Sequence, residues 1–359
     1  MNSEVKRNEV FGYDDFFESN RKKLKLDGFS VARVIAEYKG AYRVKNMSGE
    51  YLAKITGKQM FNASTREDYP AVGDWVAITE LDAKQAVIHG MLPRRTAIKR
   101  KYSNKNETQI IATNIDIAFV IESVDRDYNL NRFERYFAIA KNGGVKPAII
   151  LNKIDLISKE ELLSKLVQIK NRFNNIDVVL TSAKTDEGLD ELKKYVSKGK
   201  TYCFLGSSGV GKSSLINKLL GGNIIKTENI SLHTGKGKHT TTNRQMYFLE
   251  NGAIVIDNPG MREVGMTDSD AGIDNIFEEI TVLAKKCRYV DCTHIHEPGC
   301  EVLALLKSGK LNQDKYSNYI NLKKEAEYYQ MTEFEKREKN RQFGRFLKTA
   351  KKQLKEYKR

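Results

Sequence analysis

The sequence is poor in cysteine and has no long uninterrupted run of apolar residues. Only four of its 359 residues are cysteine, which is too few for a disulfide scaffold. Three of the four lie between Cys287 and Cys300 beside histidines, an arrangement that indicates metal binding rather than cross-linking. No apolar run is long enough to span a bilayer, and the charged segment Met1–Asp27 lacks the hydrophobic region of a secretory signal. We therefore expect a cytoplasmic protein that is not bound to a membrane.

The composition is that of a globular protein with a strongly basic balance. Hydrophobic residues make up 40% of the chain and charged residues 30%, and a chain of this length suffices for two or three domains with cores of their own. Lys and Arg number 61 against 46 Asp and Glu, which gives a formal net charge of +15. This excess favours a polyanionic partner such as RNA, although a merely soluble basic surface has the same composition.

The segment from about Ser30 to Ala97 has the pattern of a small all-β domain. Short β-like stretches such as Ala32–Ala36 and Gly73–Thr79 alternate with Gly, Asn and Asp turns. These strands fit a five-stranded OB-like barrel, a common platform for single-stranded nucleic acid, but an SH3-like barrel has the same pattern. The basic segment Arg94–Lys101 follows, which we interpret as a linker that is either exposed to solvent or in contact with RNA.

From Ile110 onward, apolar runs alternate with amphipathic segments such as Glu160–Phe173. We interpret the runs as buried strands of a largely parallel sheet that helices sandwich. The runs are Ile115–Ile121, Ala148–Leu151, Asp177–Leu180, Tyr202–Leu205 and Ala253–Ile256. No strand is expected after Asp268, and the sequence from Leu322 predicts a helix or a helical pair whose positive charge is concentrated in Arg341–Arg359.

One glycine-rich segment has the pattern of a phosphate-binding loop. It follows the apolar run that ends at Leu205 and precedes the helix-like Ser214–Leu220. Glycines allow backbone N–H groups to surround a phosphate, and the helix N-terminus adds positive potential. We predict that Lys212 contacts the β- and γ-phosphates and that Ser213 binds Mg²⁺. The predicted nucleotide-binding residues of this segment are Gly206, Ser207, Ser208, Gly209, Val210, Gly211, Lys212, Ser213 and Ser214.

The motif Asn152–Asp155 indicates that the nucleotide carries guanine. It follows a predicted strand, at the end where ligands of parallel sheets bind. The Asp155 carboxylate can accept hydrogen bonds from guanine N1–H and the 2-amino group, which adenine does not offer. Asn152 is expected to contact the N7/O6 edge, and the stem of Lys153 is expected to pack over the ring.

Two further segments complete the predicted site. Ser182, Ala183 and Lys184 follow another apolar run, and the Ala183 N–H is expected to meet guanine O6. Asp257 ends the last run, where its carboxylate can hold a Mg²⁺-bound water while the Gly260 N–H faces the γ-phosphate. The base-recognition motifs thus precede the phosphate loop, whereas Ras-like GTPases have the loop first. A circular permutation explains this order, because domain termini often lie close together on the surface.

The residue after Gly260 bears on the rate of hydrolysis. Ras-like enzymes carry a water-orienting Gln at this position, whereas Met261 cannot orient water. Basal hydrolysis is therefore expected to be slow unless another side chain enters the site. The Gly-rich segment Gly235–Thr242 offers His239 to position water and Thr241, among three consecutive threonines, to complete Mg²⁺ coordination. An ordinary solvated histidine is the alternative for His239.

Cys287, Cys292, His294 and Cys300 lie within fourteen residues and form a complete Cys₃His set for tetrahedral zinc. The spacing differs from the common Cys-x₂-Cys, so His296 could replace His294, and a reduced, metal-free loop is also compatible with it. A site with four protein ligands has no position for water, so a zinc ion there would be structural. Cys203, inside a predicted strand, is expected to be an inert core thiol.

Together these motifs resemble the ribosome small-subunit-dependent GTPase A family (RsgA, also called YjeQ or YloQ). The resemblance covers nearly the whole chain and rests on the combination of the barrel, the permuted motif order and the Cys-x₄-Cys-x-His-x₅-Cys spacing. It implies an OB-fold over residues 29–104, a circularly permuted GTPase domain over 105–267, and a zinc-binding, mainly helical, basic domain over 268–359. The N-terminal extension over residues 1–28 and the long basic C-terminal tail depart from the family pattern.

The resemblance also implies a function. Members of the family hydrolyse GTP to GDP and phosphate, with stimulation by the 30S ribosomal subunit during its late maturation, and are released afterwards. The implied partners are the 30S subunit and its 16S rRNA, GTP and GDP, and inhibitory guanosine tetra- and pentaphosphate. The implied cofactors are one structural Zn²⁺ and the Mg²⁺ bound with GTP, and the implied catalytic residue is His239, in place of the missing Gln. We expect a monomer.

A second interpretation comes from a different functional class. An RNA-binding protein that uses GTP only as a conformational ligand would have negligible turnover, and no partner would accelerate it. An ATPase or kinase is disfavoured because Asp155 is matched to guanine rather than adenine.

Overall fold

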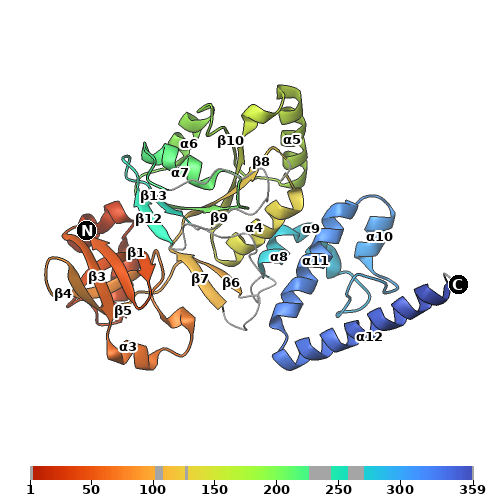
Figure 1. Cartoon of the computed structure of the whole chain (residues 1–359), viewed down its shortest axis with the longest axis horizontal. Helices are drawn as coiled ribbons and strands as arrows, with labels where there is room; N and C mark the ends of the chain where they lie inside the picture. Colours follow the sequence, from red (N-terminus) through yellow and green to blue (C-terminus); the bar gives the residue numbers. More distant parts are fainter. Residues whose placement is uncertain (1–2, 102–107, 126–127, 226–243, 258–270, 358–359) are drawn as a thin grey trace. The chain divides into compact units, whose positions relative to one another are not determined.

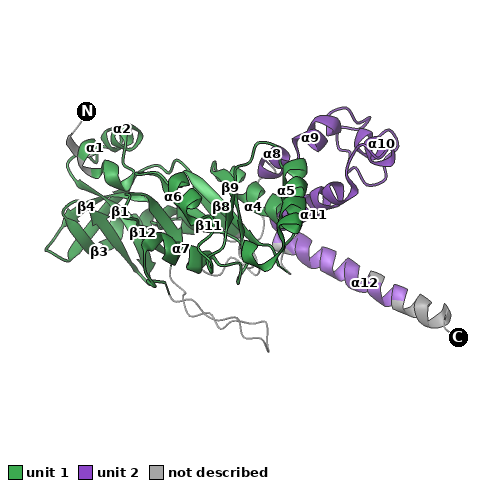
Figure 2. Cartoon of the chain, turned by 90° about the horizontal axis from the view of Figure 1, so that it is seen from above, with its two compact units in different colours: residues 1–100, 109–264 green, residues 101–108, 265–359 purple. Residues whose placement is uncertain are grey.

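Figure 1 shows a computed structural model of the chain, which describes residues 3–101, 108–125, 128–225, 244–257 and 271–357. The chain forms two compact units, coloured separately in Figure 2. The first contains residues 1–100 and 109–264, and the second contains residues 101–108 and 265–359. Both predicted β-containing regions therefore lie in the first unit.

Five strands of the first unit form a closed barrel. The strand order is β1-β2-β3-β5-β4, and β4 pairs back with β1. All neighbours are antiparallel except β3 and β5, which are parallel. This is the strand order of an OB-fold, so the prediction of an OB-like barrel is confirmed and the SH3-like alternative is excluded. The elements are β1 (Ser30–Tyr38), β2 (Ala41–Asn46), β3 (Gly49–Ile55), α3 (Gly57–Asn62), η2 (Arg66–Asp68), β4 (Trp75–Glu80) and β5 (Gln85–Met91).

The rest of the first unit is built on a mostly parallel sheet, as the apolar runs predicted. The order is β10-β9-β8-β11-β13-β12, and β12 alone is antiparallel to its neighbour β13. Helix α4 packs against β8 and β9, α6 against β10, and α7 against β13. The strands are β8 (Ile117–Ser123), β9 (Lys146–Asn152), β10 (Val178–Thr181), β11 (Thr201–Leu205), β12 (Gln245–Phe248) and β13 (Ile254–Asp257). The helices are α4 (Leu130–Asn142), η3 (Ile154–Leu156), α5 (Lys159–Arg172), α6 (Leu189–Tyr195) and α7 (Lys212–Leu220).

The barrel and the parallel sheet are joined edge to edge. Strand β12 pairs with β1 of the barrel in antiparallel orientation, with Ala36 opposite Gln245. The pairing makes one continuous sheet of eleven strands out of the two regions. The nucleotide motifs and the barrel therefore share a single hydrogen-bonded framework.

The N-terminal extension, whose structure was not predicted from the sequence, contributes to the core of the first unit. Phe17 and Tyr13 are each 1% exposed and pack with the fully buried Trp75, and the rings of Tyr13 and Trp75 lie 4.7 Å apart, edge to face. The Asp14 carboxylate caps the second helix by accepting a hydrogen bond from the N–H of Phe16. The elements of the extension are α1 (Ser3–Asn8), η1 (Glu9–Phe11) and α2 (Asp15–Lys23).

One buried arginine connects the extension, the barrel and the parallel sheet. The Arg33 guanidinium donates to the carbonyls of Phe11 at 2.5 Å, Gly73 at 3.2 Å and Asn114 at 3.0 Å. Burial lowers the pKa of Arg33 to about 10, so the group remains charged at neutral pH. Its side chain is thus tied to three chain segments that are far apart in sequence.

The interpretation of residues 94–101 as a linker is wrong. Part of the segment is β6 (Ala97–Lys101), which pairs with β7 (Thr108–Thr113) in a two-stranded sheet. Arg94 donates to the fully buried Asp74 carboxylate at 2.7 Å, Arg95 pairs with Asp14 at 2.6 Å, and Lys99 with Glu67 at 2.5 Å. These cations are matched by carboxylates of the chain itself, which weakens the case for RNA contact through this segment.

In the part that the structure describes, the second unit is helical except for residues of β6 and β7, as predicted for the sequence after Asp268. Its core is formed by apolar side chains that are 1% exposed or less, including Phe277, Ile280, Val302 and Leu322. The predicted C-terminal helical pair is present as the last two helices. The helices are α8 (Ala271–Ile276), α9 (Glu278–Ala284), α10 (Glu301–Lys307), α11 (Gln313–Gln330) and α12 (Glu333–Tyr357). Among the described residues, no helix has the length and apolar character needed to cross a bilayer.

We predict that Arg33→Met destabilises the first unit by about 3 kcal/mol, because three carbonyls lose a charged donor and only that of Gly73 keeps a second one, the Asn114 side-chain amide at 3.0 Å. Urea unfolding followed by tryptophan fluorescence measures this directly, since Trp75 is the only tryptophan. Arg43→Met is the matched control, because Arg43 is exposed on the neighbouring strand. Equal unfolding midpoints for the two variants would contradict the role given to Arg33.

Candidate functional site

The predicted phosphate loop connects β11 to α7 through a backbone path in which three glycines, Gly206, Gly209 and Gly211, have positive φ angles. Gly206 and Gly211 have φ angles of 149° and 98°. A Cβ atom on Gly206 would lie 2.4 Å from the carbonyl oxygen of Ile121, and one on Gly211 would lie 2.3 Å from the side-chain nitrogen of Asn152. Ser207, Ser208, Gly209 and Val210 lie between these glycines, and Lys212, Ser213 and Ser214 form the first turn of α7.

The Lys212 ammonium lies across this loop. Its Nζ donates to the carbonyls of Gly206 at 2.7 Å and Ser207 at 2.5 Å. Ser207 is in turn hydrogen-bonded to the Tyr136 hydroxyl, and burial raises the pKa of Tyr136 to about 12. The loop thus holds a positive charge beside its own backbone, where a phosphate would be attracted. Tyr136 comes from α4, and no local pattern in the sequence pointed to it.

Asn152 connects the predicted base-binding motif to the phosphate loop. It ends β9 and is 1% exposed. Its Nδ2 donates to the Val210 carbonyl at 2.8 Å, while its Oδ1 accepts from the Thr181 hydroxyl at 3.0 Å. Asn152 therefore fixes the loop relative to the ends of β9 and β10, a structural role beside the base contact that the sequence predicts.

Asp155 and Ser182 lie together beyond the ends of these strands. The Ser182 hydroxyl donates to Asp155 Oδ1 at 2.6 Å and accepts from the N–H groups of Lys184 and Thr185, at 3.2 and 3.1 Å. The serine therefore orients one carboxylate oxygen of Asp155, while the other has no hydrogen-bond partner among the described residues. A carboxylate held in this way can receive two N–H donors from a flat ring.

Lys153 has the left-handed backbone conformation, with φ at 63°. Its ammonium pairs with Asp125 Oδ2 at 2.9 Å, and Asp125 Oδ1 accepts from the Ser123 hydroxyl at 2.6 Å. This network directs the Lys153 stem along the ends of β8 and β9. Asp125, two residues after β8, was missed because a single carboxylate after a strand is not a distinctive signal.

The structure places Asp257 at the end of β13, beside the strand that leads into the phosphate loop. Its side chain is 4% exposed, and β13 pairs in parallel with β11. The carboxyl ends of β9, β10, β11 and β13 thus bring the predicted base, phosphate and magnesium motifs to one edge of the sheet. Gly260, His239 and Thr241 lie outside the described residues.

In the second unit, Cys287, Cys292, His294 and Cys300 place their four ligand atoms within 4.8 Å of one another. The Sγ atoms of Cys287 and Cys300 are 3.8 Å apart, and His294 Nδ1 lies 3.6 and 3.4 Å from them. Around a tetrahedral ion, sulfur–sulfur and sulfur–nitrogen separations of about 3.8 and 3.6 Å follow from ordinary zinc bond lengths. The cluster therefore has the dimensions of a metal site.

The surroundings of the cluster favour His294 over His296. His294 is 7% exposed and takes the left-handed conformation, with φ at 60°. Its carbonyl accepts a hydrogen bond from the Tyr316 hydroxyl at 2.6 Å, which ties the loop to α11. His296 is exposed and lies outside the cluster.

Comparisons with known proteins agree on one family. The model of the RsgA GTPase family matches residues 91–267. Small ribosomal subunit biogenesis GTPase RsgA 2 of Lactiplantibacillus plantarum is 40% identical over 85% of this chain and 85% of its own length. Small ribosomal subunit biogenesis GTPase RsgA 1 of Bacteroides thetaiotaomicron is 35% identical over 98% of this chain and 99% of its own.

Two solved structures share the fold. YjeQ from Thermotoga maritima matches with a TM-score of 0.60 and 24% identity, over 81% of this chain and 96% of that one. YloQ, a circularly permuted GTPase, matches with a TM-score of 0.58 and 21% identity, over 83% of this chain and 94% of that one.

We predict that Asp155→Asn weakens binding of GTP and favours xanthosine triphosphate, whose 2-oxo group accepts where guanine donates. Each lost charge-assisted hydrogen bond corresponds to about 1.5–3 kcal/mol, or roughly tenfold or more in affinity. Competition between the two nucleotides measures the change. Asp190→Asn, at an aspartate whose side chain is 86% exposed on α6, is the control. Unchanged selectivity for GTP in Asp155→Asn would remove the assignment.

Proposed function

This chain belongs to the RsgA GTPase family and is a GTP hydrolase, and from this premise we propose that it acts in the biogenesis of the small ribosomal subunit. In the proposed cycle the GTP form binds the 30S subunit late in its maturation, the subunit stimulates hydrolysis to GDP and phosphate, and the protein is then released. The names of its relatives place them in this process.

The observation that carries the proposal is the convergence of the nucleotide motifs at one sheet edge. The loop with Lys212 supplies a cradle for phosphates, and the Asp155 carboxylate, oriented by Ser182 at 2.6 Å, supplies a guanine-specific acceptor. A Mg²⁺ ion bound with GTP would neutralise charge on the phosphates. Ser213, Thr241 and the carboxylate of Asp257 are the proposed groups of this chain that hold it, directly or through water.

We propose that His239 orients the attacking water and so controls when GTP is hydrolysed, because Met261 stands where Ras-like GTPases carry a water-orienting Gln. A histidine can hold the attacking water through a ring nitrogen and accept its proton. Its arrival in the site on contact with the subunit would make turnover depend on the ribosome. Guanosine tetra- and pentaphosphate present the same base and β-phosphate to the site and would compete with GTP.

We propose that the second unit binds 16S rRNA. We propose that Cys287, Cys292, His294 and Cys300 bind one structural Zn²⁺, which matches the separations of their ligand atoms. The basic residues of Arg341–Arg359, a range that covers most of α12, offer positive charge for rRNA phosphates. We propose that the protein works as a cytoplasmic monomer.

His239→Ala is expected to retain GTP and 30S binding but to lose 30S-stimulated turnover by about 100-fold, the scale of a lost general base. Phosphate release with and without purified 30S subunits measures the effect. His233→Ala is the matched control, since it removes a histidine from the same stretch of sequence. Full stimulated turnover in His239→Ala would refute the assignment, and absence of stimulation in the unaltered protein would favour a GTP-regulated binding protein instead.

Cys292→Ser is expected to unfold the second unit while the first unit still binds GTP, because metal binding supplies folding free energy to a small helical region. Metal analysis of the unaltered protein, purified without chelators, should find one zinc per chain. Cys203→Ser is the control, because Cys203 is buried in β11 and is not part of the metal-ligand cluster found among the described residues. A zinc-free protein with an intact second unit would end the assignment.

A further inference from the structure

Tyr136 contacts the phosphate loop but belongs to none of the sequence motifs of the nucleotide site. It lies in α4, which packs against β8 and β9, and it is 2% exposed. Its hydroxyl forms a hydrogen bond with the side chain of Ser207, the second residue of the loop. Because burial raises the pKa of Tyr136 to about 12, the hydroxyl keeps its proton at neutral pH and the hydrogen bond is one between neutral groups.

Ser207 in turn helps to determine where the Lys212 ammonium lies. The Ser207 carbonyl accepts a hydrogen bond from Lys212 Nζ at 2.5 Å, and the Gly206 carbonyl accepts a second at 2.7 Å. Gly206 is packed closely against β8, since a Cβ atom there would lie 2.4 Å from the Ile121 carbonyl oxygen. The position of the ammonium therefore depends on how Ser207, the next residue along the loop, is held.

The far side of the loop is held by a different element. Asn152, at the end of β9, donates to the Val210 carbonyl at 2.8 Å. Tyr136 contacts Ser207 from α4, three residues before Val210. The loop is thus fixed on both sides of its exposed residue Ser208.

Helix α4 is a rigid support for the tyrosine. Arg132, one turn before Tyr136 on the same face of the helix, pairs with the fully buried carboxylate of Glu122 on β8 at 3.2 Å. Glu134 pairs with Arg172, at the end of α5, at 2.7 Å. These ion pairs fix α4 to the sheet and to α5, so the Tyr136 hydroxyl is presented to the loop from a regular element and not from a second loop.

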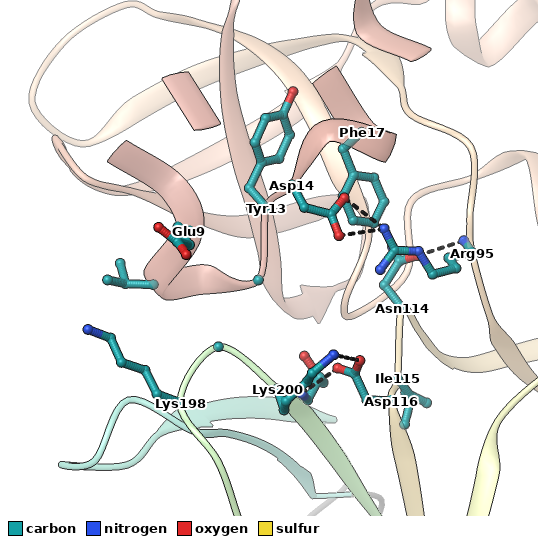
Figure 3. A pocket seen from close by; sticks show the side chains of 14 residues that line it. Glu9, Tyr13, Asp14, Phe17, Arg95, Asn114, Ile115, Asp116, Lys198 and Lys200 are labelled. Carbon is teal, nitrogen blue, oxygen red and sulfur yellow. Dashed lines mark hydrogen bonds and ion pairs between the residues drawn. The ribbon is translucent and has the colours of Figure 1, made fainter. Parts of the chain in front are cut away.

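Strand β11, which leads into the loop, is fixed at its start by contacts that do not involve Tyr136. Asp116 accepts hydrogen bonds from the Thr201 N–H at 2.8 Å and from the Lys200 ammonium at 2.9 Å. These residues lie in the wall of a cavity of about 370 Å³ at the start of the strand (Figure 3). A change at Tyr136 is therefore expected to act on the loop and not on the strand before it.

We propose that Tyr136 is a positioning residue for GTP hydrolysis, which acts through Ser207 to hold the Lys212 ammonium where it meets the β- and γ-phosphates. A donor stabilises developing charge best when it is oriented in advance, because no reorganisation is then needed during the reaction. In the bound ground state the flexible lysine stem can follow the phosphates. Loss of the tyrosine hydroxyl should therefore slow the chemical step more than it weakens GTP binding. The inference rests on the proposed nucleotide site and not on the ribosomal role.

The test measures single-turnover hydrolysis of GTP by the full-length protein without ribosomal subunits, together with GTP affinity. Tyr136→Phe should lower the rate constant about two- to tenfold, the kinetic equivalent of one neutral hydrogen bond, and should change the affinity by less than about twofold. Ser207→Ala should have the same effect. Because both variants remove one interaction, the double variant should be no slower than either single variant.

Tyr202→Phe is the matched control for stability. Tyr202 is 1% exposed, and its hydroxyl accepts from the Ser197 N–H at 2.8 Å and donates to the Tyr195 carbonyl at 3.1 Å. Its loss should lower the midpoint of urea unfolding but leave the rate of hydrolysis unchanged. An equal loss of rate in Tyr202→Phe, or additive losses in the double variant, would show that Tyr136 only stabilises the fold. Either result overturns the proposal, as does an unchanged rate in Tyr136→Phe.

Lys212→Met separates failure of this inference from failure of the nucleotide site. Weakened GTP binding in Lys212→Met together with a normal rate in Tyr136→Phe would leave the site in place and overturn the role of Tyr136. Unchanged GTP binding in Lys212→Met would remove the assignment of the phosphate loop, and this inference with it. Hydrolysis measured without ribosomal subunits does not depend on the ribosomal role, so the two are tested separately.

Discussion

The arrangement of the first unit depends on the burial of one charged side chain. A guanidinium taken out of water is costly unless strong acceptors surround it, and Arg33 meets this condition only where three chain segments meet. The extension supplies Phe11, the barrel Gly73, and the entry to β8 Asn114. Displacing any one of them would leave a charged donor unsatisfied, so the arginine selects one mutual arrangement of the three.

The nucleotide site follows the same logic on a smaller scale. Its polar groups are hydrogen-bonded to one another before any ligand binds. Thr181 donates to Asn152, Asn152 donates to the Val210 carbonyl, and Ser182 donates to Asp155. A ligand then meets donors and acceptors whose side-chain entropy has already been lost on folding. The conformational entropy of these side chains is therefore lost when the chain folds, and not when the ligand binds.

The parts of this structure that depend on local sequence could be predicted, and those that depend on distant partners could not. The phosphate loop is fixed by glycine spacing between a strand and a helix, and the buried strands by continuous apolar runs. The type of barrel depends on the pairing of β3 with β5, which no short pattern encodes. Arg94 has the same appearance in sequence whether its partner is Asp74 or solvent. Phe17 and Tyr13 lie in a highly charged segment, so the local sequence did not predict their burial against Trp75.

The pairing of Ala36 with Gln245 has a consequence for communication within the molecule. Tyr38, the last residue of β1, lies two residues beyond Ala36. Gln245 begins β12, which directly follows the sequence that contains His239, and β12 leads on to β13 and Asp257. Strand β12 is therefore hydrogen-bonded to the barrel strand β1 on one side and, on the other, to β13, which ends at Asp257. A shift in the position of β12 would therefore act at once on a strand of the barrel and on the strand that carries Asp257.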